Sequence, residues 1–346
     1  MFLLAIALVA EICDRVGLFD VAGHALARLA GGRVAVLWIG LVVLCLATTT
    51  VLSLDAPAVL VAPVAIAMAK RATVNPIPFA VTAVWLANTG SLMLPVSNLT
   101  NLLSNALHGS PLQDNFTAAT WLPALTAAAV TAGAIAAFWP RVLRGRFKLG
   151  AAPRPKDKDL VVFAAVVCLA LAAAFAFGVP PTWPTMAAAL VLAFAYARRR
   201  PGAWRKLRVP WVMALIAFAL FAVVHWVGPL GLNAWLAGLL GEGEGFAQEL
   251  RVAAVGALGS NAVNNLPAFL ALQPGVEDAA SRSVALLIGA NAGSIVTPWG
   301  SLATLLWLWR CKVSGVRINL GGYVLRSAAV ATAVVPASVG ALQLPP

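Results

Sequence analysis

Long apolar segments constrain this chain more than any other feature. The clearest are residues 118–139, 160–177, 211–227 and 321–342, and each approaches the ~20 apolar residues that a helix needs to cross a bilayer. The sequence has no alternation with a period of two residues, so helices rather than strands must bond the backbone internally. Charged residues make up only 10% of the 346 positions, whereas a soluble domain carries about 25%. The sequence predicts an all-α integral membrane protein with several spans.

Positive charge is concentrated in short loops. Most of the 24 lysines and arginines lie within residues 70–71, 141–158, 198–208 and 310–317. Such clusters mark the cytoplasmic side of a membrane protein, and the segments between them fit pairs of spans. We therefore expect a multi-pass protein of a bacterial-type plasma (inner) membrane, with cytoplasmic basic loops and the lipid bilayer as a partner. This distribution accounts for the net charge of +12 without nucleic acid as a partner.

The chain contains an internal repeat. Residues 87–103 align without gaps on 290–306, with eight of the 17 pairs identical. A second match precedes it in each half, where 55–60 aligns on 265–270 and pairs Asp55 with Asn265. The charge pattern places the two halves on opposite sides of the membrane. Polar, proline-containing breaks at corresponding places in two inverted halves are typical of secondary transporters and indicate a binding site near the membrane midplane.

The expected fold is an all-α inverted-repeat transporter with two re-entrant hairpins and two unwound transmembrane helices. Segment 34–69 could instead be two full spans, but its polar middle favours a hairpin with its tip at membrane depth. The predicted parts are a first repeat at 1–140 (short at its N-terminus, hairpin about 34–69, broken helix 79–107), a basic cytoplasmic linker at 141–159, and a second repeat at 160–346 (hairpin about 251–274, broken helix 283–309).

The breaks supply the candidate substrate site. Pro95 and Pro298 remove a backbone donor, and Gly90 and Gly293 weaken the helix before each proline. The neighbouring polar groups either repair these kinks or, with half-helix N-termini, line a substrate cavity. The paired breaks favour the cavity. The candidate substrate-binding residues are Ser53, Asp55, Asn88, Ser97, Asn98, Thr100, Asn101, Asn264, Asn265, Asn291, Thr297, Ser301 and Thr304.

Asp55 is the one acid predicted at the membrane midpoint, because the other eleven lie in loops or near predicted helix ends. An ionisable residue within a membrane is costly and by default a functional candidate. We predict that Asp55 couples transport to protons or another cation. The alternative is a structural role, in which Asp55 caps the second limb of the hairpin.

No catalytic or cofactor motif is expected. The phosphate-binding pattern of ATPases is missing, so either an ion gradient or a soluble ATPase partner must drive transport. The four cysteines are far apart in sequence and predict neither a disulfide framework nor a metal site. The chain is therefore expected to be a transporter without a cofactor or a bound metal, and not an enzyme.

The chain resembles the arsenite/antimonite efflux permeases of the ion-transporter superfamily, which also holds sodium/dicarboxylate symporters and sodium/proton antiporters. The resemblance rests on residues 53–55, 87–103, 264–268 and 289–306. It implies a scaffold, a moving transport region, alternating access, a homodimer, and proton-coupled export of neutral As(OH)3, with Asp55 as the hairpin-tip acid. The chain differs from the family in its short N-terminal part and in Ala56-Pro57 at the hairpin tip.

Three other functions remain open. A citrate or dicarboxylate permease would need a basic group aimed at the carboxylates, and neither predicted site contains Lys or Arg. A sodium/proton antiporter could use Asp55, although a single acid is a sparse site for Na⁺. A membrane subunit without transport activity is the third. In each transport reading the cargo is a small inorganic or organic anion or a metalloid.

Overall fold

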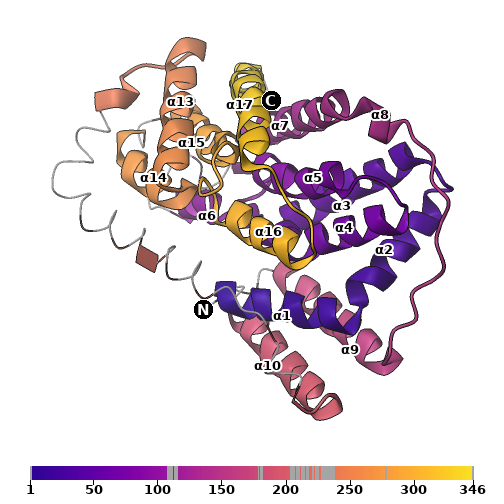
Figure 1. Ribbon diagram of the computed structural model, residues 1–346. Coiled ribbons are helices and arrows are strands. Elements are labelled where there is room, and N and C mark those ends of the chain that lie inside the picture. The colour runs from indigo at the N-terminus through magenta and orange to yellow at the C-terminus, as the bar shows by residue number, and fades with distance from the viewer. Residues whose placement is uncertain are drawn as a thin grey trace.

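The computed structural model describes residues 2–106, 112, 116–177, 179, 182–202, 207, 211, 215, 218, 219, 222, 226, 238–276 and 279–344. These residues form helices joined by turns and, at 144–157, by a longer non-helical segment, with no strand among them, as the sequence predicts (Figure 1). In chain order the first half contains α1 (Phe2–Val16), α2 (Leu18–Leu29), α3 (Val34–Leu52), the π-helical turn η1 (Pro57–Val61), α4 (Ala62–Arg71), α5 (Pro76–Thr89), the 3₁₀ turn η2 (Pro95–Ser97), α6 (Leu99–Ala106), α7 (Phe116–Phe138) and α8 (Pro140–Leu143). The second half contains α9 (Lys158–Ala176), α10 (Thr182–Arg199), α13 (Phe246–Val263), α14 (Asn265–Leu272), η5 (Gln273–Gly275), α15 (Ala280–Asn291), η6 (Gly293–Ile295), α16 (Leu302–Val313) and α17 (Leu320–Leu342).

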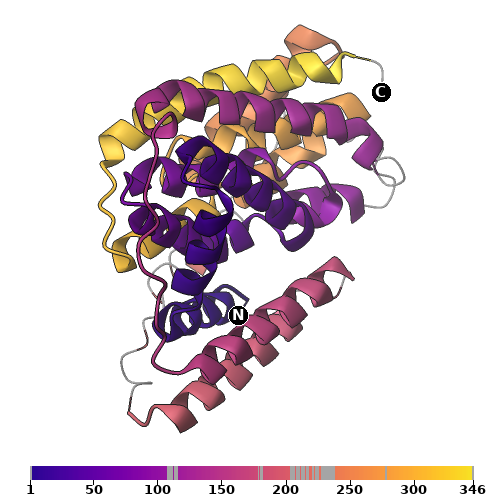
Figure 2. The ribbon, with the colours of Figure 1, turned by 90° about the vertical axis from the view of Figure 1, so that its right-hand side faces the viewer.

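Two long helices from opposite halves lie side by side. α7 and α17 contact each other along one edge of the bundle (Figure 2). Both are long and apolar enough to cross a membrane, and they correspond to the predicted spans 118–139 and 321–342. The predicted span 160–177 corresponds to α9. The predicted span 211–227 lies largely outside the described residues.

α9 and α10 form a hairpin at the other side of the molecule (Figure 2). Their outward side chains are apolar and exposed, among them Leu169, Leu190 and Phe194. An exposed apolar surface of this extent on a membrane protein is one that lipid or another helix covers. Near the basic loop, Arg199 lies 3.1 Å from both Asp157 and Asp159. The pKa of Asp157 is lowered because the backbone N–H of Leu160, and also Arg199, donate to its carboxylate.

The predicted interruptions are present in the helices. The segment 34–69 contains α3, a break at 53–56 and then η1 and α4; the segment 251–274 contains α13, a break at Asn264 and then α14. α5 and α6 are separated by residues 90–98, and α15 and α16 by residues 292–301. Proline removes the donor within each longer break, and short 3₁₀ turns replace the α-helix there.

The two hairpin tips share an unusual backbone. Ser53 and Asn264 have φ angles of 83° and 95° and ψ angles of 158° and 150°, a region that residues other than glycine rarely occupy. The next residue donates a backbone hydrogen bond of 2.9 Å in each half, from Leu54 to Ser97 and from Asn265 to Gly300. Ser97 and Gly300 are aligned in the sequence repeat. The same local geometry therefore recurs in both halves.

This geometry corrects the alignment of the hairpin tips by one residue. The sequence alignment pairs Asp55 with Asn265, but the backbone hydrogen bonds pair Leu54 with Asn265. The first half has one more residue between the tip and the following proline, Pro57, than the second half has before Pro267. The π-helical turn η1 follows this extra residue, and a π turn is the usual way for a helix to absorb one. Either Asp55 or Ala56 is thus a residue of the first half without a backbone counterpart in the second.

Candidate functional site

Amides and hydroxyls from both halves meet at the centre of the bundle. Asn291, at the end of α15, accepts hydrogen bonds of 2.8 Å on its Oδ1 from Asn98 Nδ2 and Thr100 Oγ1. Its Nδ2 donates to Asn101 Oδ1 at 2.7 Å. All four side chains are buried. We refer to these four residues, with Asn88, Ser91 and Ser294, as the central polar network.

The network also contains a serine from each half. Ser294 Oγ lies 2.8 Å from the carbonyl of Asn291 and 3.4 Å from Asn88 Oδ1. Ser91 Oγ donates to the carbonyl of Asn88 at 2.8 Å and lies 3.4 Å from Asn98 Nδ2. These side chains carry no formal charge, and their polar groups are bonded to one another, as buried polar groups require.

A helix N-terminus follows each of the two longer breaks. Ser301 Oγ accepts from the backbone N–H of Thr304 at 3.2 Å and lies 2.9 Å from its hydroxyl, so it caps α16. Asn98 Oδ1 accepts from the backbone N–H of Thr100 at 3.3 Å at the start of α6. Asn98 and Ser301 are aligned in the repeat. Helix N-termini carry partial positive charge and free N–H groups, which favour oxygen-rich ligands.

The tip of the second hairpin is held against the second broken helix. Asn264 Nδ2 donates to the carbonyl of Trp299 at 2.8 Å. Asn261 accepts from the Thr297 backbone N–H on its Oδ1 at 2.8 Å and donates to the carbonyl of Gly293 at 2.7 Å. Asn265 Oδ1 accepts from the backbone N–H of the next residue, Leu266, at 3.0 Å.

Fewer side-chain hydrogen bonds hold the tip of the first hairpin than hold the tip of the second. Ser97 Oγ donates to the carbonyl of Thr50 at 2.9 Å. Ser53 and Asp55 are half-buried. Among the described residues, none forms a hydrogen bond or an ion pair with the carboxylate of Asp55.

The predicted site residues therefore fall into four groups. The structure brings Asn88, Asn98, Thr100, Asn101 and Asn291 into the central polar network. Asn264, Asn265 and Thr297 surround the second tip, and Ser53, Asp55 and Ser97 the first. Ser301 and Thr304 cap α16. The second limb of each hairpin packs on the other half, η1 against α16 and α14 against α6, so the groups are parts of one interlocked unit.

Sequence reasoning missed Ser91, Ser294 and Asn261. The signal for the two serines was available, because Ser91 and Ser294 are one of the identical pairs in the repeat. Asn261 lies in the middle of an ordinary helical segment, and only the fold reveals that it faces the broken helix.

A buried ion pair was also missed. Arg310 in α16 is fully buried, and its guanidinium lies 3.3 Å from Glu11 Oε2 and 3.3 Å from Asp14 Oδ2 in α1. Glu11 is buried as well and pairs with Arg15 at 2.7 Å. Glu11 is therefore a buried acid that sequence reasoning did not single out.

The Glu11→Leu variant is expected to lower stability by about 3 kcal/mol, because it removes a buried carboxylate from a buried guanidinium. The double variant Glu11→Leu/Arg310→Met should recover most of this loss, since the apolar pair leaves no fully buried charge. Asp14 loses its contact with Arg310, but its side chain is partly exposed to solvent. Thermal unfolding in detergent micelles measures both. Asp20→Asn, which removes the exposed partner of Arg71 at 3.5 Å, should change little. A double variant less stable than Glu11→Leu would contradict this account.

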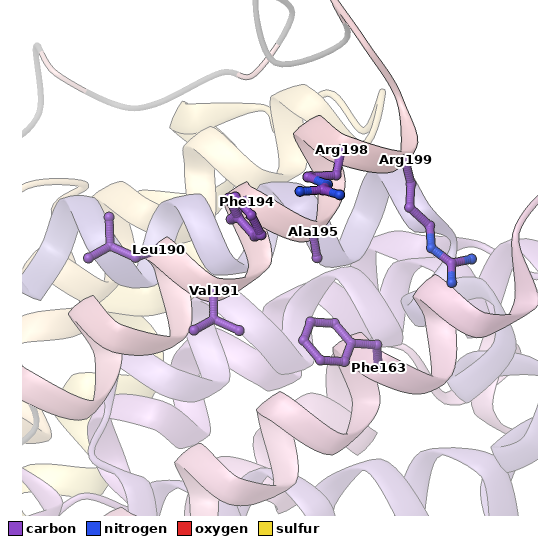
Figure 3. A pocket seen from close by; sticks show the side chains of 7 residues that line it. All are labelled: Phe163, Leu190, Val191, Phe194, Ala195, Arg198 and Arg199. Atoms are coloured by element: carbon purple, nitrogen blue, oxygen red, sulfur yellow. The ribbon is translucent and has the colours of Figure 1, made fainter.

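A hollow on the described surface lies away from these residues. It is a groove of about 630 Å³ between α9 and α10, lined by Phe163, Leu190, Val191, Phe194, Ala195, Arg198 and Arg199 (Figure 3). Its walls are apolar, and the guanidinium of Arg198 lies 5.6 Å from the centre of the Phe194 ring. The groove belongs to the outward surface of the α9–α10 hairpin and contains none of the predicted site residues.

Comparisons with known proteins agree with this architecture. A helical bundle with apolar outer helices and a buried polar centre fits a multi-pass membrane transporter. The family model described as "Citrate transporter" matches residues 1–286. The chain belongs to this family.

Relatives bearing another name match over most of their length. An "Arsenical pump membrane protein" of Yersinia enterocolitica is 28% identical over 350 residues, covering 92% of this chain and 80% of the relative. Proteins of the same name from Escherichia coli strain K12 and Shigella flexneri are 27% identical over 348 residues with the same coverage. The resemblance stated from the sequence is thereby confirmed.

Proposed function

We propose that this protein exports arsenite and antimonite by proton-coupled alternating access. The observation that carries the proposal is the central polar network, which contains amides and hydroxyls from both halves and no Lys or Arg. As(OH)3 is neutral and presents three hydroxyl groups, so it can exchange hydrogen bonds with such groups without needing a charged partner. The names of the relatives support this cargo.

Alternating access requires two halves that can exchange roles. Three paired features support an inverted repeat: the positive φ angles of Ser53 and Asn264, the backbone hydrogen bonds that follow them, and the caps Asn98 and Ser301. The bonds of Asn291 to Asn98, Thr100 and Asn101 join the halves. Cargo hydroxyls that replace these bonds would loosen one half from the other. The proposal places the basic loops in the cytoplasm of a bacterial-type inner membrane.

A carboxylate permease is the second candidate, because the family description names citrate transport. A citrate site needs positive charge or several donors directed at carboxylates. Helix N-termini at α6 and α16 could supply part of it. The two candidates therefore differ in cargo charge, which transport experiments separate directly.

The test is cargo accumulation in everted membrane vesicles that contain this protein. With a proton gradient, we expect arsenite measured by mass spectrometry to accumulate inside the vesicles, and to leak out once an uncoupler collapses the gradient. Vesicles without the protein are the control. Accumulation of citrate instead would favour the second candidate, and sodium-dependent proton release would favour an antiporter. Folded, inserted protein with no arsenite accumulation would refute the arsenite assignment. The same measurement with purified protein in liposomes tests whether a soluble ATPase is needed.

A further inference from the structure

Two cysteines from distant parts of the chain are in contact. Cys13 in α1 and Cys168 in α9 are 155 positions apart, and their Sγ atoms lie 3.5 Å from each other. Both are free thiols; Cys13 is buried and Cys168 is half-buried. Their spacing in the sequence gave no sign of this pair.

The environment of the pair limits what it could bind. The described residues hold no group of three or more His, Cys, Asp or Glu side chains that could bind a metal ion. Zinc prefers four protein ligands in structural sites, and a two-thiol site does not provide them. Trivalent arsenicals are thiophilic and need only two thiols when they keep one substituent of their own. Soft thiolate ligands select such soft centres.

We propose that Cys13 and Cys168 form a dithiol site for trivalent arsenicals. For As(OH)3, two As–S bonds form and two As–O bonds break. The two thiol protons leave with the two hydroxyl groups as two water molecules, and the third hydroxyl stays on arsenic. Arsenic remains trivalent, so no oxidant or reductant is required. The product is a covalent bridge between α1 and α9.

The site is separate from the central polar network and would act on the scaffold rather than on the cargo. α1 also contacts α10 and, through Glu11, Arg310 of α16. A bridge between α1 and α9 would therefore fasten the α9–α10 hairpin to the body of the molecule. The inference does not depend on arsenite transport, because binding to thiols can occur whether or not the protein moves this cargo.

The test uses the whole protein, purified in detergent, reduced and then freed of reductant. Phenylarsine oxide is added, and the remaining thiols are alkylated with N-ethylmaleimide after denaturation. Intact mass should show four alkylated cysteines without the arsenical and two with it, and peptide mapping should place the protected pair at Cys13 and Cys168. A small dithiol such as 2,3-dimercaptopropanol should restore all four.

Single-cysteine variants test which two thiols bind the arsenical. Cys13→Ala and Cys168→Ala should each raise the arsenical concentration for half-protection by about 100-fold or more, because two linked donors bind far more tightly than one. The matched controls Cys45→Ala and Cys311→Ala should keep the protection. Peptide mapping of the unaltered protein gives an answer even if a variant misfolds. Protection of cysteines other than Cys13 and Cys168, or no protection in the reduced protein, would overturn the proposal. Neither outcome bears on transport, which the vesicle experiment measures.

Discussion

Everted vesicles carrying Asp55→Asn are expected to show gradient-driven arsenite accumulation that is about tenfold lower than that of the unaltered protein. A tenfold loss corresponds to ~1.4 kcal/mol of coupling free energy. The substitution keeps the size and hydrogen-bonding shape of the side chain but removes the group that can gain or lose a proton. Asp55 is half-buried at the first hairpin tip, and its carboxylate has no partner among the described residues. The corresponding stretch of the second half contains only amides, at Asn264 and Asn265. Asp55 is thus the acid best placed to carry the coupling proton.

A second measurement separates coupling from binding. Vesicles preloaded with arsenite can exchange it for labelled arsenite from outside without net proton movement, so Asp55→Asn should retain this exchange. Asp20→Asn is the matched acid-to-amide control, since Asp20 is exposed and pairs with Arg71, and it should accumulate arsenite normally. Full accumulation by Asp55→Asn would assign the coupling to another group. Loss of both accumulation and exchange would indicate that Asp55 binds the cargo itself.

Local sequence signals predicted the architecture well. Pro95 and Pro298 cannot continue a helix, and the polar residues beside them cannot face lipid, so both broken helices could be placed from sequence alone. The breaks at residues 53–56 and at Asn264 were expected from the same kind of signal, and the re-entrant hairpins stay a prediction. Five of the amides and hydroxyls chosen from these breaks, Asn88, Asn98, Thr100, Asn101 and Asn291, lie together in the central polar network.

Contacts between distant segments could not be predicted in the same way. Glu11 and Arg310 are 299 positions apart, and Cys13 and Cys168 are 155 apart. Each of these side chains lies on a helix, and the side chains that it contacts on other helices depend on how the helices pack. The one-residue shift at the first hairpin tip could not be seen in the sequence either, because the alignment of the two halves there was set by matching Pro57 with Pro267. Apolar periodicity carries no information about such a shift when both faces of a helix are apolar.

Close packing of α13 against α15 depends on small residues. A Cβ at Gly289 would lie 2.0 Å from the carbonyl oxygen of Ala253, and one at Gly293 would lie 2.4 Å from the Cβ of Ala257. Gly289 lies in α15 and Gly293 lies four positions later at the start of η6, while Ala253 and Ala257 are one helical turn apart in α13. This is the small-residue pattern that lets membrane helices approach closely. The first half has Leu86 where the second has Gly289, so this closeness belongs to the second half.

Gly289→Val is therefore expected to prevent correct assembly of the second hairpin. The clash is with backbone atoms of α13, which cannot move without separating the helices, and overpacking of this kind costs about 3 kcal/mol or more. Because α15 carries Asn291, separating the helices would also displace the central polar network. The protein should aggregate in size-exclusion chromatography in detergent and unfold at a lower temperature. Gly133→Ala in α7 is the matched control, because its Cβ would meet nothing within 4 Å, and alanine is favoured over glycine by up to about 1 kcal/mol in a helix. A monodisperse Gly289→Val protein with normal arsenite transport would show that α13 and α15 do not need this close contact.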